Sequence, residues 1–177
     1  MLLATYALLT LSIEQKEERR LIARIRSYVA KYQKRPNEID PGILASQLDK
    51  LGALAESHHK EKLEECLIPA VREASTDAAP LLDHLASLRR TGRAMLCVMR
   101  RSLRLAARNG QHQVENVIGN VEGYCQNLLE RLAKEENELL PLARRVIHGQ
   151  GWFAIGAAFL AQDARHEERK RHHLAIG

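Results

Sequence analysis

The sequence consists mainly of long segments in which apolar residues recur every three or four positions. The clearest is the stretch from Tyr124 to Ala143, where Leu128, Leu132, Leu139 and Leu142 follow one another at helical spacing. This spacing places the apolar side chains on one face of a helix, and such a helix is stable mainly through packing against other helices. We find no alternating run of apolar and polar residues of the kind that forms strands, so the sequence predicts an all-α fold.

Proline, glycine and capping residues divide the chain into predicted helices. We expect a first helix from the N-terminus to about residue 34, and a second from Pro41, capped by Asp40, to about residue 73. A third should end at Asn109-Gly110, a fourth near residue 147, and a shorter fifth should cover about residues 152–173. Four long helices joined by short loops predict an up-and-down four-helix bundle over residues 1–150, with a short helix and tail over 151–177, in a single domain.

The basic charge of the chain is concentrated on the third predicted helix. Arginine outnumbers lysine 19 to 8, and the formal net charge is +5. Arg93, Arg100, Arg104 and Arg108 fall on one stripe of this helix, opposite its apolar face, and are candidates for binding an anion or an acidic partner. Because no aromatic residues and no recognition motif accompany the stripe, we do not expect nucleic acid to bind there.

The cysteines and the N-terminal segment bear on where the protein works. Cys66, Cys97 and Cys125 are odd in number and lack paired spacing, which favours buried thiols in a reducing compartment. The apolar N-terminal segment has no basic residue before it and is too short to span a membrane, so we expect a cytoplasmic protein. Neither a glycine-rich phosphate loop nor a nucleophile triad is visible, and a non-enzymatic role is therefore expected.

Two stretches carry a family resemblance. SHHKEKLEECLIPAV, at residues 57–71, and RLAKEENELLPLA, at residues 131–143, resemble the H-H-x-K-E-E-x-x-L-F-P and H-I-x-K-E-E-x-x-L-F-P-x-A elements of the hemerythrin-like (HHE cation-binding) family. EERRLIARI in the first helix and GWFAIGAAF near the C-terminus extend the similarity over most of the chain. The resemblance implies a four-helix bundle that holds a diiron site and senses or carries oxygen or nitric oxide.

The ligand positions of this family are only partly retained. In the family frame, Glu135 matches a ligand glutamate, whereas Arg131, Arg19 and Arg89 replace ligand histidines of the fourth, first and third helices. Two alternative registers stay open. Glu14-Gln15 can take the place of Glu18-Arg19 in the first helix, and Asp83-His84 can take the place of Leu88-Arg89 in the third.

The second helix departs from the family pattern in its spacing. The pair His58-His59 is present, but the residues four positions further along are Lys62 and Leu63, not carboxylates. Glu64 comes one position too late for His59, and a π-bulge in the helix would be needed to bring its side chain round.

These departures predict a degraded metal site without a cofactor. The candidate metal ligands are His58 or His59, Glu64, His84 and Glu135. Arginine has no lone pair to donate and repels cations, so Arg19, Arg89 and Arg131 are expected to pair with Glu18, Glu64 and Glu135 instead. The protein would then be a regulatory or protein-interaction module with an unknown partner.

Two other interpretations remain open. The arginines can be ordinary surface residues. Alternatively, iron binds through an altered ligand set, which requires His59, His84 and Glu135 to converge and Arg131 to turn away.

Overall fold

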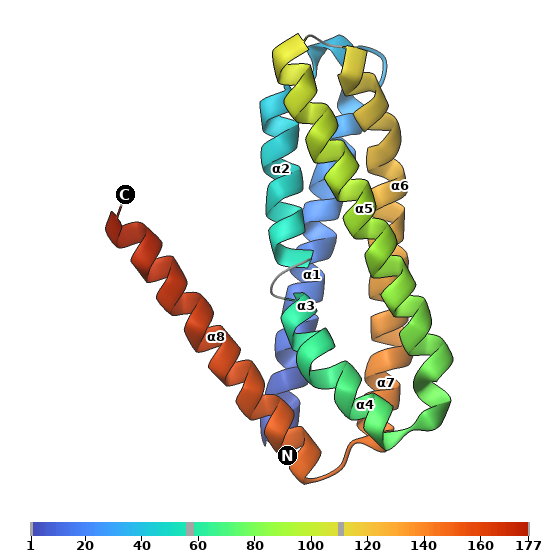
Figure 1. Ribbon diagram of the computed structural model, residues 1–177, viewed down its shortest axis with the longest axis vertical. Helices are drawn as coiled ribbons and strands as arrows, with labels where there is room; N and C mark the ends of the chain where they lie inside the picture. The colour runs from blue at the N-terminus through green and yellow to red at the C-terminus, as the bar shows by residue number, and fades with distance from the viewer. Residues whose placement is uncertain (1, 56–58, 110–111, 177) are drawn as a thin grey trace.

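The structure, a computed structural model, describes residues 2–55, 59–109 and 112–176, and it is almost wholly helical (Figure 1). The side chains of some residues within these ranges, including His59 and Arg108, lie outside the description. Its α-helices are α1 (Leu2–Lys31), α2 (Pro41–Ala53), α3 (His59–Lys62), α4 (Ile68–Ala74), α5 (Ala79–Asn109), α6 (His112–Lys134), α7 (Leu140–Val146) and α8 (Gln150–Ile176). Two π-turns, Leu63–Leu67 and Glu135–Leu139, join α3 to α4 and α6 to α7.

The helices form the up-and-down bundle that the sequence predicts. Helix α1 rises from the base in Figure 1, the α2–α4 arm returns, α5 rises again and the α6–α7 arm descends. Helix α1 contacts both α2 and α6, and α5 contacts both α2 and α6, which closes the ring of four. In the second arm, α2 ends at Ala53, π-helical geometry follows at Leu54 and Ala55, and α3 begins at His59.

Local sequence accounts for the start of α2. The Asp40 carboxylate accepts hydrogen bonds from the backbone N–H groups of Gly42, at 2.7 Å, and Ile43, at 3.1 Å. Pro41 occupies the first helical position, where the missing N–H costs nothing because no intrahelical acceptor faces it. The predicted cap is thus confirmed.

Each of these two π-turns is followed, after one residue, by a proline. Pro69 and Pro141 have no N–H group, and the proline ring crowds the carbonyl four residues earlier in an α-helix. The wider turn relieves this crowding, and it is closed by the N–H of Ile68 donating to the Leu63 carbonyl and that of Leu140 donating to the Glu135 carbonyl. The two arms of the bundle therefore carry the same local irregularity at matching places.

The apolar core is split into two clusters. One lies toward the loops at the top of Figure 1 and includes Ile22, Leu48, Met99 and Leu128. The other lies toward the base and is formed by the N-terminal part of α1, the residues from Leu63 to Leu85, and the residues from Leu139 to Phe159. Along α1, α5 and α6, buried polar residues separate the two clusters.

Helix α8 is longer than the short C-terminal helix that we expected, since it covers 27 residues. It buries Ile155 and Phe159 against the lower cluster and crosses α1 where Gly156 meets Leu3. Its C-terminal part diverges from the bundle (Figure 1). Among the described residues, no helix combines the length and the apolar character needed to cross a membrane.

The crossing of α8 and α1 yields a first prediction. A Cβ atom at position 156 would lie 2.6 Å from the Leu3 Cβ and 2.9 Å from the Leu3 carbonyl oxygen, closer than packed atoms approach. Gly156→Ala should therefore displace α8 and lower the free energy of unfolding by about 1–3 kcal/mol, despite the better helix propensity of alanine. The measurement is urea denaturation followed by circular dichroism and by Trp152 fluorescence.

Gly119→Ala in α6 is the matched control. A Cβ atom there meets nothing within 4 Å, so this variant should gain up to about 1 kcal/mol. Equal stabilisation by both variants would contradict a close crossing at Gly156.

Candidate functional site

The boundary between the two apolar clusters is a layer of buried polar side chains. Helix α1 contributes Gln15 and Glu18, α5 contributes Arg89, α6 contributes Arg131, and the second π-turn contributes Glu135. Helical periodicity puts them there, because each lies three to five positions from apolar core residues of the same helix, such as Leu11 and Ile22 on α1. With Glu64 from the first π-turn, which lies at the edge of this boundary with its side chain 36% exposed, these residues form what we call the ion-pair layer.

The most deeply buried ion pair of this layer joins Arg131 and Glu18. The Arg131 guanidinium donates to Glu18 Oε1, and its Nε lies 3.4 Å from Glu135 Oε1. All three side chains are at most 1% exposed. Charges removed from water this completely are tolerated only when opposite charges and hydrogen bonds compensate them. The contact therefore joins α1 to the α6–α7 arm through groups that have no access to water.

Arg89 extends the layer to the other two helical arms. Its Nη1 lies 2.7 Å from Glu64 Oε1 and its Nη2 lies 3.4 Å from Glu135 Oε1. Glu135 is also approached from α1, since the Gln15 amide donates to its Oε2 at 3.4 Å. Glu135 thus lies between two guanidinium groups and one amide, and the layer takes residues from every arm of the bundle.

The π-turns supply two of the three carboxylates. Glu64 is the second residue of the first π-turn, and Glu135 is the first residue of the second. The bulge that the sequence required for Glu64 to face inward is present. In both turns the carboxylate and the proline that follows belong to one short sequence motif, so the wider turn and the placement of the carboxylate occur together.

The structure decides between the alternative registers of the first and third helices. Arg89 is buried, whereas His84 is half-exposed and its Nε2 lies 3.1 Å from Glu130 Oε1 on the surface. In α1, Gln15 is the inward residue of the shifted register. The expectation that Arg19 points inward is wrong, since Arg19 follows the buried Glu18 and its side chain is therefore turned about 100° around the helix axis from the inward side.

Arg19 instead makes a surface ion pair with Glu136. Its Nε and Nη2 donate to the two carboxylate oxygens at 3.2 and 2.6 Å, and both side chains are about one-third exposed. Glu18, the residue before it, takes the buried place.

The remaining predicted residues are less informative. His58 lies outside the described residues, and His59 belongs to α3, but its side chain is not described. On α5, Arg93 and Arg104 are exposed, and the half-buried Arg100 donates to Asp49 at 2.7 Å. The side chain of Arg108 is not described.

Of the cysteines, Cys125 is fully buried, and burial raises the pKa of its thiol to about 12, whereas Cys97 is exposed, contrary to expectation.

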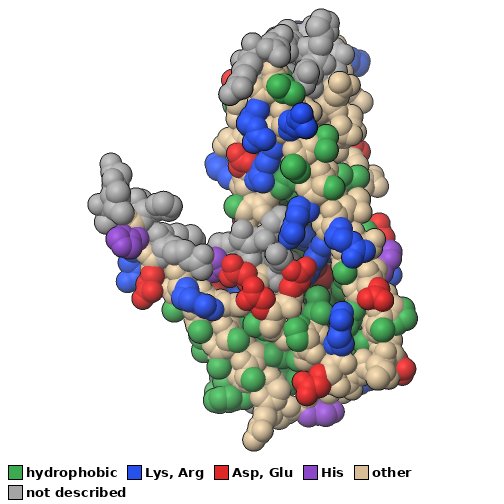
Figure 2. Space-filling view, viewed as in Figure 1, with side chains coloured by type: hydrophobic (Ala, Val, Ile, Leu, Met, Phe, Trp, Pro, Cys, Tyr) green, Lys and Arg blue, Asp and Glu red, His purple; other side chains and the backbone are tan. Residues whose placement is uncertain are grey.

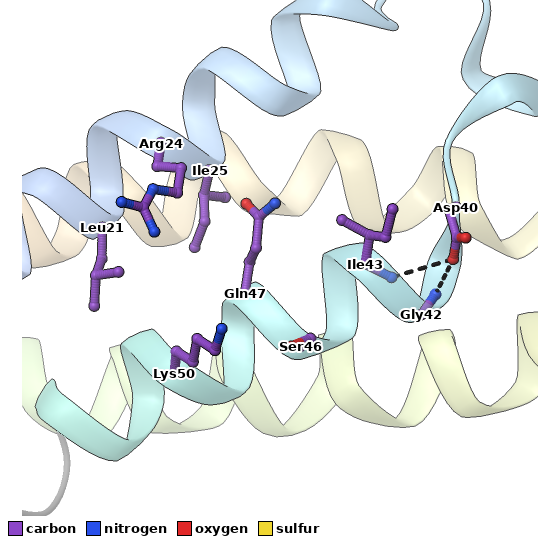
Figure 3. A pocket seen from close by; sticks show the side chains of 9 residues that line it. All are labelled: Leu21, Arg24, Ile25, Asp40, Gly42, Ile43, Ser46, Gln47 and Lys50. Carbon is purple, nitrogen blue, oxygen red and sulfur yellow. Dashed lines mark hydrogen bonds between the residues drawn. The ribbon is translucent and has the colours of Figure 1, made fainter.

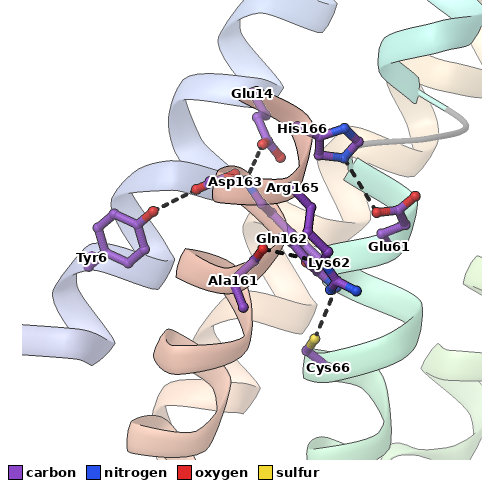
Figure 4. A network of polar contacts seen from close by, with 10 residues as sticks. All are labelled: Tyr6, Glu14, Glu61, Lys62, Cys66, Ala161, Gln162, Asp163, Arg165 and His166. Atoms are coloured by element: carbon purple, nitrogen blue, oxygen red, sulfur yellow. Dashed lines mark hydrogen bonds and ion pairs between the residues drawn. The ribbon is translucent and has the colours of Figure 1, made fainter. Parts of the chain in front are cut away.

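A second polar network, which the sequence did not reveal, fastens α8 to the bundle (Figure 4). The buried Lys62 ammonium lies 2.5 Å from Glu14 Oε1 and 2.7 Å from Asp163 Oδ1, and the Tyr6 hydroxyl donates to Asp163 Oδ2 at 2.6 Å. Burial alone would raise the pKa of Asp163, but the hydrogen bonds from Lys62 and Tyr6 outweigh it and lower this pKa overall. Asp163 is the only acid in the apolar first half of α8, and that isolation was the available signal.

A groove between α1 and α2 is separate from both networks (Figure 3). It has a volume of about 470 Å³ and includes Arg24, Ser46, Gln47 and Lys50. None of its lining residues belongs to the ion-pair layer.

The ion-pair layer does not fit a metal ion. A diiron centre in a helical bundle uses inward carboxylates and histidines as its donors. Here two permanently charged guanidinium groups contact the inward carboxylates, and among the described residues no three His, Cys, Asp or Glu side chains are grouped to hold a metal. The convergence of His84 with Glu135 that an altered iron site requires is absent, and Arg131 faces inward.

Comparison with known proteins identifies one family. The family model described as Hemerythrin HHE cation binding domain matches residues 10–143, which include every residue of the ion-pair layer. No curated protein and no solved structure matches the chain significantly.

The buried contact of Arg131 yields a second prediction. Arg131→Met leaves Glu18 and Glu135 buried without this cation and should lower the free energy of unfolding at pH 7 by about 3–5 kcal/mol. Adding Glu18→Gln removes one of the stranded charges and should restore part of the loss. Urea denaturation of both variants measures the two effects.

The control is Arg26→Met, which removes a two-pronged but exposed ion pair with Glu122. Its cost should stay below about 1 kcal/mol. If Arg131→Met cost no more than this, Arg131 would not be buried against carboxylates.

Proposed function

The chain belongs to the hemerythrin HHE cation-binding family, and we propose that it is a member in which buried ion pairs have replaced the metal site. The bundle then serves as a non-enzymatic regulatory or protein-interaction module. The observation that carries this proposal is the placement of the Arg89 and Arg131 guanidinium groups against Glu64, Glu18 and Glu135 inside the bundle.

The chemistry of arginine supports a metal site that has been replaced by ion pairs, and not one that merely binds metal more weakly. An arginine stays protonated at any physiological pH, so it cannot become a ligand by losing a proton. Its charge supplies what a cation would otherwise supply, namely compensation for carboxylates that are removed from water. The layer can therefore hold the four arms of the bundle together without a metal.

The surface of α5 that carries Arg90, Arg101 and Arg104 is the one that best suits an interaction role. These three side chains are exposed, and within the described residues none of them makes an ion pair. An acidic partner surface would compensate these charges, and its binding would weaken as salt is raised. This role requires no metal.

Metal content tests the proposal. Protein expressed with ample iron and purified without chelator or histidine tag should contain no stoichiometric metal and absorb only in the aromatic band. The variant that carries Gln15→His, Arg89→His and Arg131→His restores imidazole donors at inward positions and should take up iron, which shows that the assay would detect a site.

The opposite result has a clear signature. About two irons per unaltered chain, with near-ultraviolet absorption from an oxo bridge, would rule out the replaced site and favour an oxygen- or nitric-oxide-binding protein.

A further inference from the structure

The first part of α1 and the part of α8 before Asp163 are uncharged. Between Leu2 and Ile13 the sequence has no charged residue, and between Gln150 and Gln162 it has none either. A helix that is apolar on all sides is normally covered on all sides. In this structure, however, each of the two helices leaves one side uncovered.

The uncovered side is uncharged, large and mostly apolar, with Thr5 as the exposed polar residue on α1. The described residues include seven exposed large apolar side chains, and five of them lie here: Leu2, Leu9 and Ile13 on α1, and Phe153 and Leu160 on α8. Every exposed side chain of α8 between Gly151 and Ala164 is apolar, because the others are Ala154, Ala157, Ala161 and Ala164. Figure 2 shows apolar side chains on the lower part of α8.

The two stripes form one surface, which we call the α1/α8 face. Leu2, Leu9 and Ile13 share one side of α1, next to the positions that contact α8, while Phe153 and Leu160 lie two turns apart on α8, next to Gly156. A groove of about 310 Å³ joins the stripes at the base and is lined by residues of both helices, including Leu2, Trp152 and Phe153. The face is therefore continuous across the helix crossing.

We propose that the α1/α8 face binds a second copy of this chain, in a dimer with twofold symmetry. Its five large apolar side chains are 47–89% exposed, and together with the exposed alanines they can form the apolar centre of an interface that buries roughly 800 Å² per partner. A surface without charges suits a symmetric dimer, because it meets an identical surface and needs no complementary charge on a different protein.

The spacing on α8 supports the same occupant. Phe153, Ala157, Leu160 and Ala164 follow one another at intervals of four, three and four residues. This spacing is the one found along the seam of a coiled coil, where side chains of one helix enter gaps between side chains of the facing helix. Two copies of α8 can therefore interlock, with Phe153 and Leu160 as the projecting residues.

A lipid surface is the less suitable occupant. Helices that lie on membranes usually carry lysine and arginine along the edges of the apolar face. Here the first basic residues, Lys16 on α1 and Arg165 on α8, lie beyond the ends of the uncharged segments. The dimer also does not depend on the proposed function, since the face shares no residue with the ion-pair layer.

The test is the mass of the full chain in solution over roughly a hundredfold range of concentration, by sedimentation velocity and light scattering. The unaltered chain should reach twice its mass of 20.0 kDa and dissociate on dilution. Phe153→Glu with Leu160→Glu should stay monomeric, and so should Leu9→Glu with Ile13→Glu, which alters α1 instead. Emission from Trp152, at the edge of the face, should change on dilution only in the dimerising protein.

The matched control is Ile43→Glu with Val98→Glu, two residues that are similarly exposed but lie outside the face. This control should dimerise normally. A monomeric unaltered chain, open-ended growth beyond a dimer, or equal behaviour of the altered and control pairs would each overturn the proposal. A monomer that binds phosphatidylcholine vesicles, and loses this binding with Phe153→Glu and Leu160→Glu, would assign the face to lipid instead.

Discussion

The contact of Arg131 with Glu18 and Glu135 constrains the rest of the structure more than any apolar contact does. Leucine-rich helices can slide past one another at modest cost, because one apolar side chain replaces another of similar size. A guanidinium that is 1% exposed cannot slide, since moving it by one turn would leave buried charges without partners. The contact therefore fixes the axial register of α1 against the α6–α7 arm, and Arg89 does the same for α5 and the first π-turn.

The two π-turns explain how such a layer can exist in a bundle of otherwise regular helices. In a continuous α-helix, the position of Glu64 diverges from the inward face. A turn with one extra residue shifts the helix beyond it, so that Leu63 and Leu67 both meet the core while the Glu64 carboxylate reaches the buried Arg89. Pro69, which has no N–H group, follows shortly after this turn. The same holds for Glu135 with Pro141, and the bundle gains two inward carboxylates at one level.

Much of this could be predicted from the sequence, and the failures have physical causes. Helical periodicity predicted the bundle. The motifs around Glu64 and Glu135 indicated these two carboxylates and the arginines that pair with them, Arg89 and Arg131. Arg19 was misplaced because a helix turns through about 100° per residue, so a one-residue choice between Glu18 and Arg19 decides which side chain is buried. The contact of Lys62 with Asp163 was missed because periodicity describes each helix by itself and cannot place α8 beside α3.

The distribution of polarity in the lower half of the bundle is the reverse of the usual one. Charges lie inside it, in the ion-pair layer and around Lys62, while the outer side of α1 and α8 is apolar. Lys62 links the two features, since it contacts Glu14 of α1, next to Gln15 of the layer, and Asp163 of α8. Covering the α1/α8 face would hold α8 in place and shield the contacts of Lys62 from water. An ion pair is stronger when water is kept away from it. An apolar exterior and a charged interior are thus consistent in a protein whose α8 is covered.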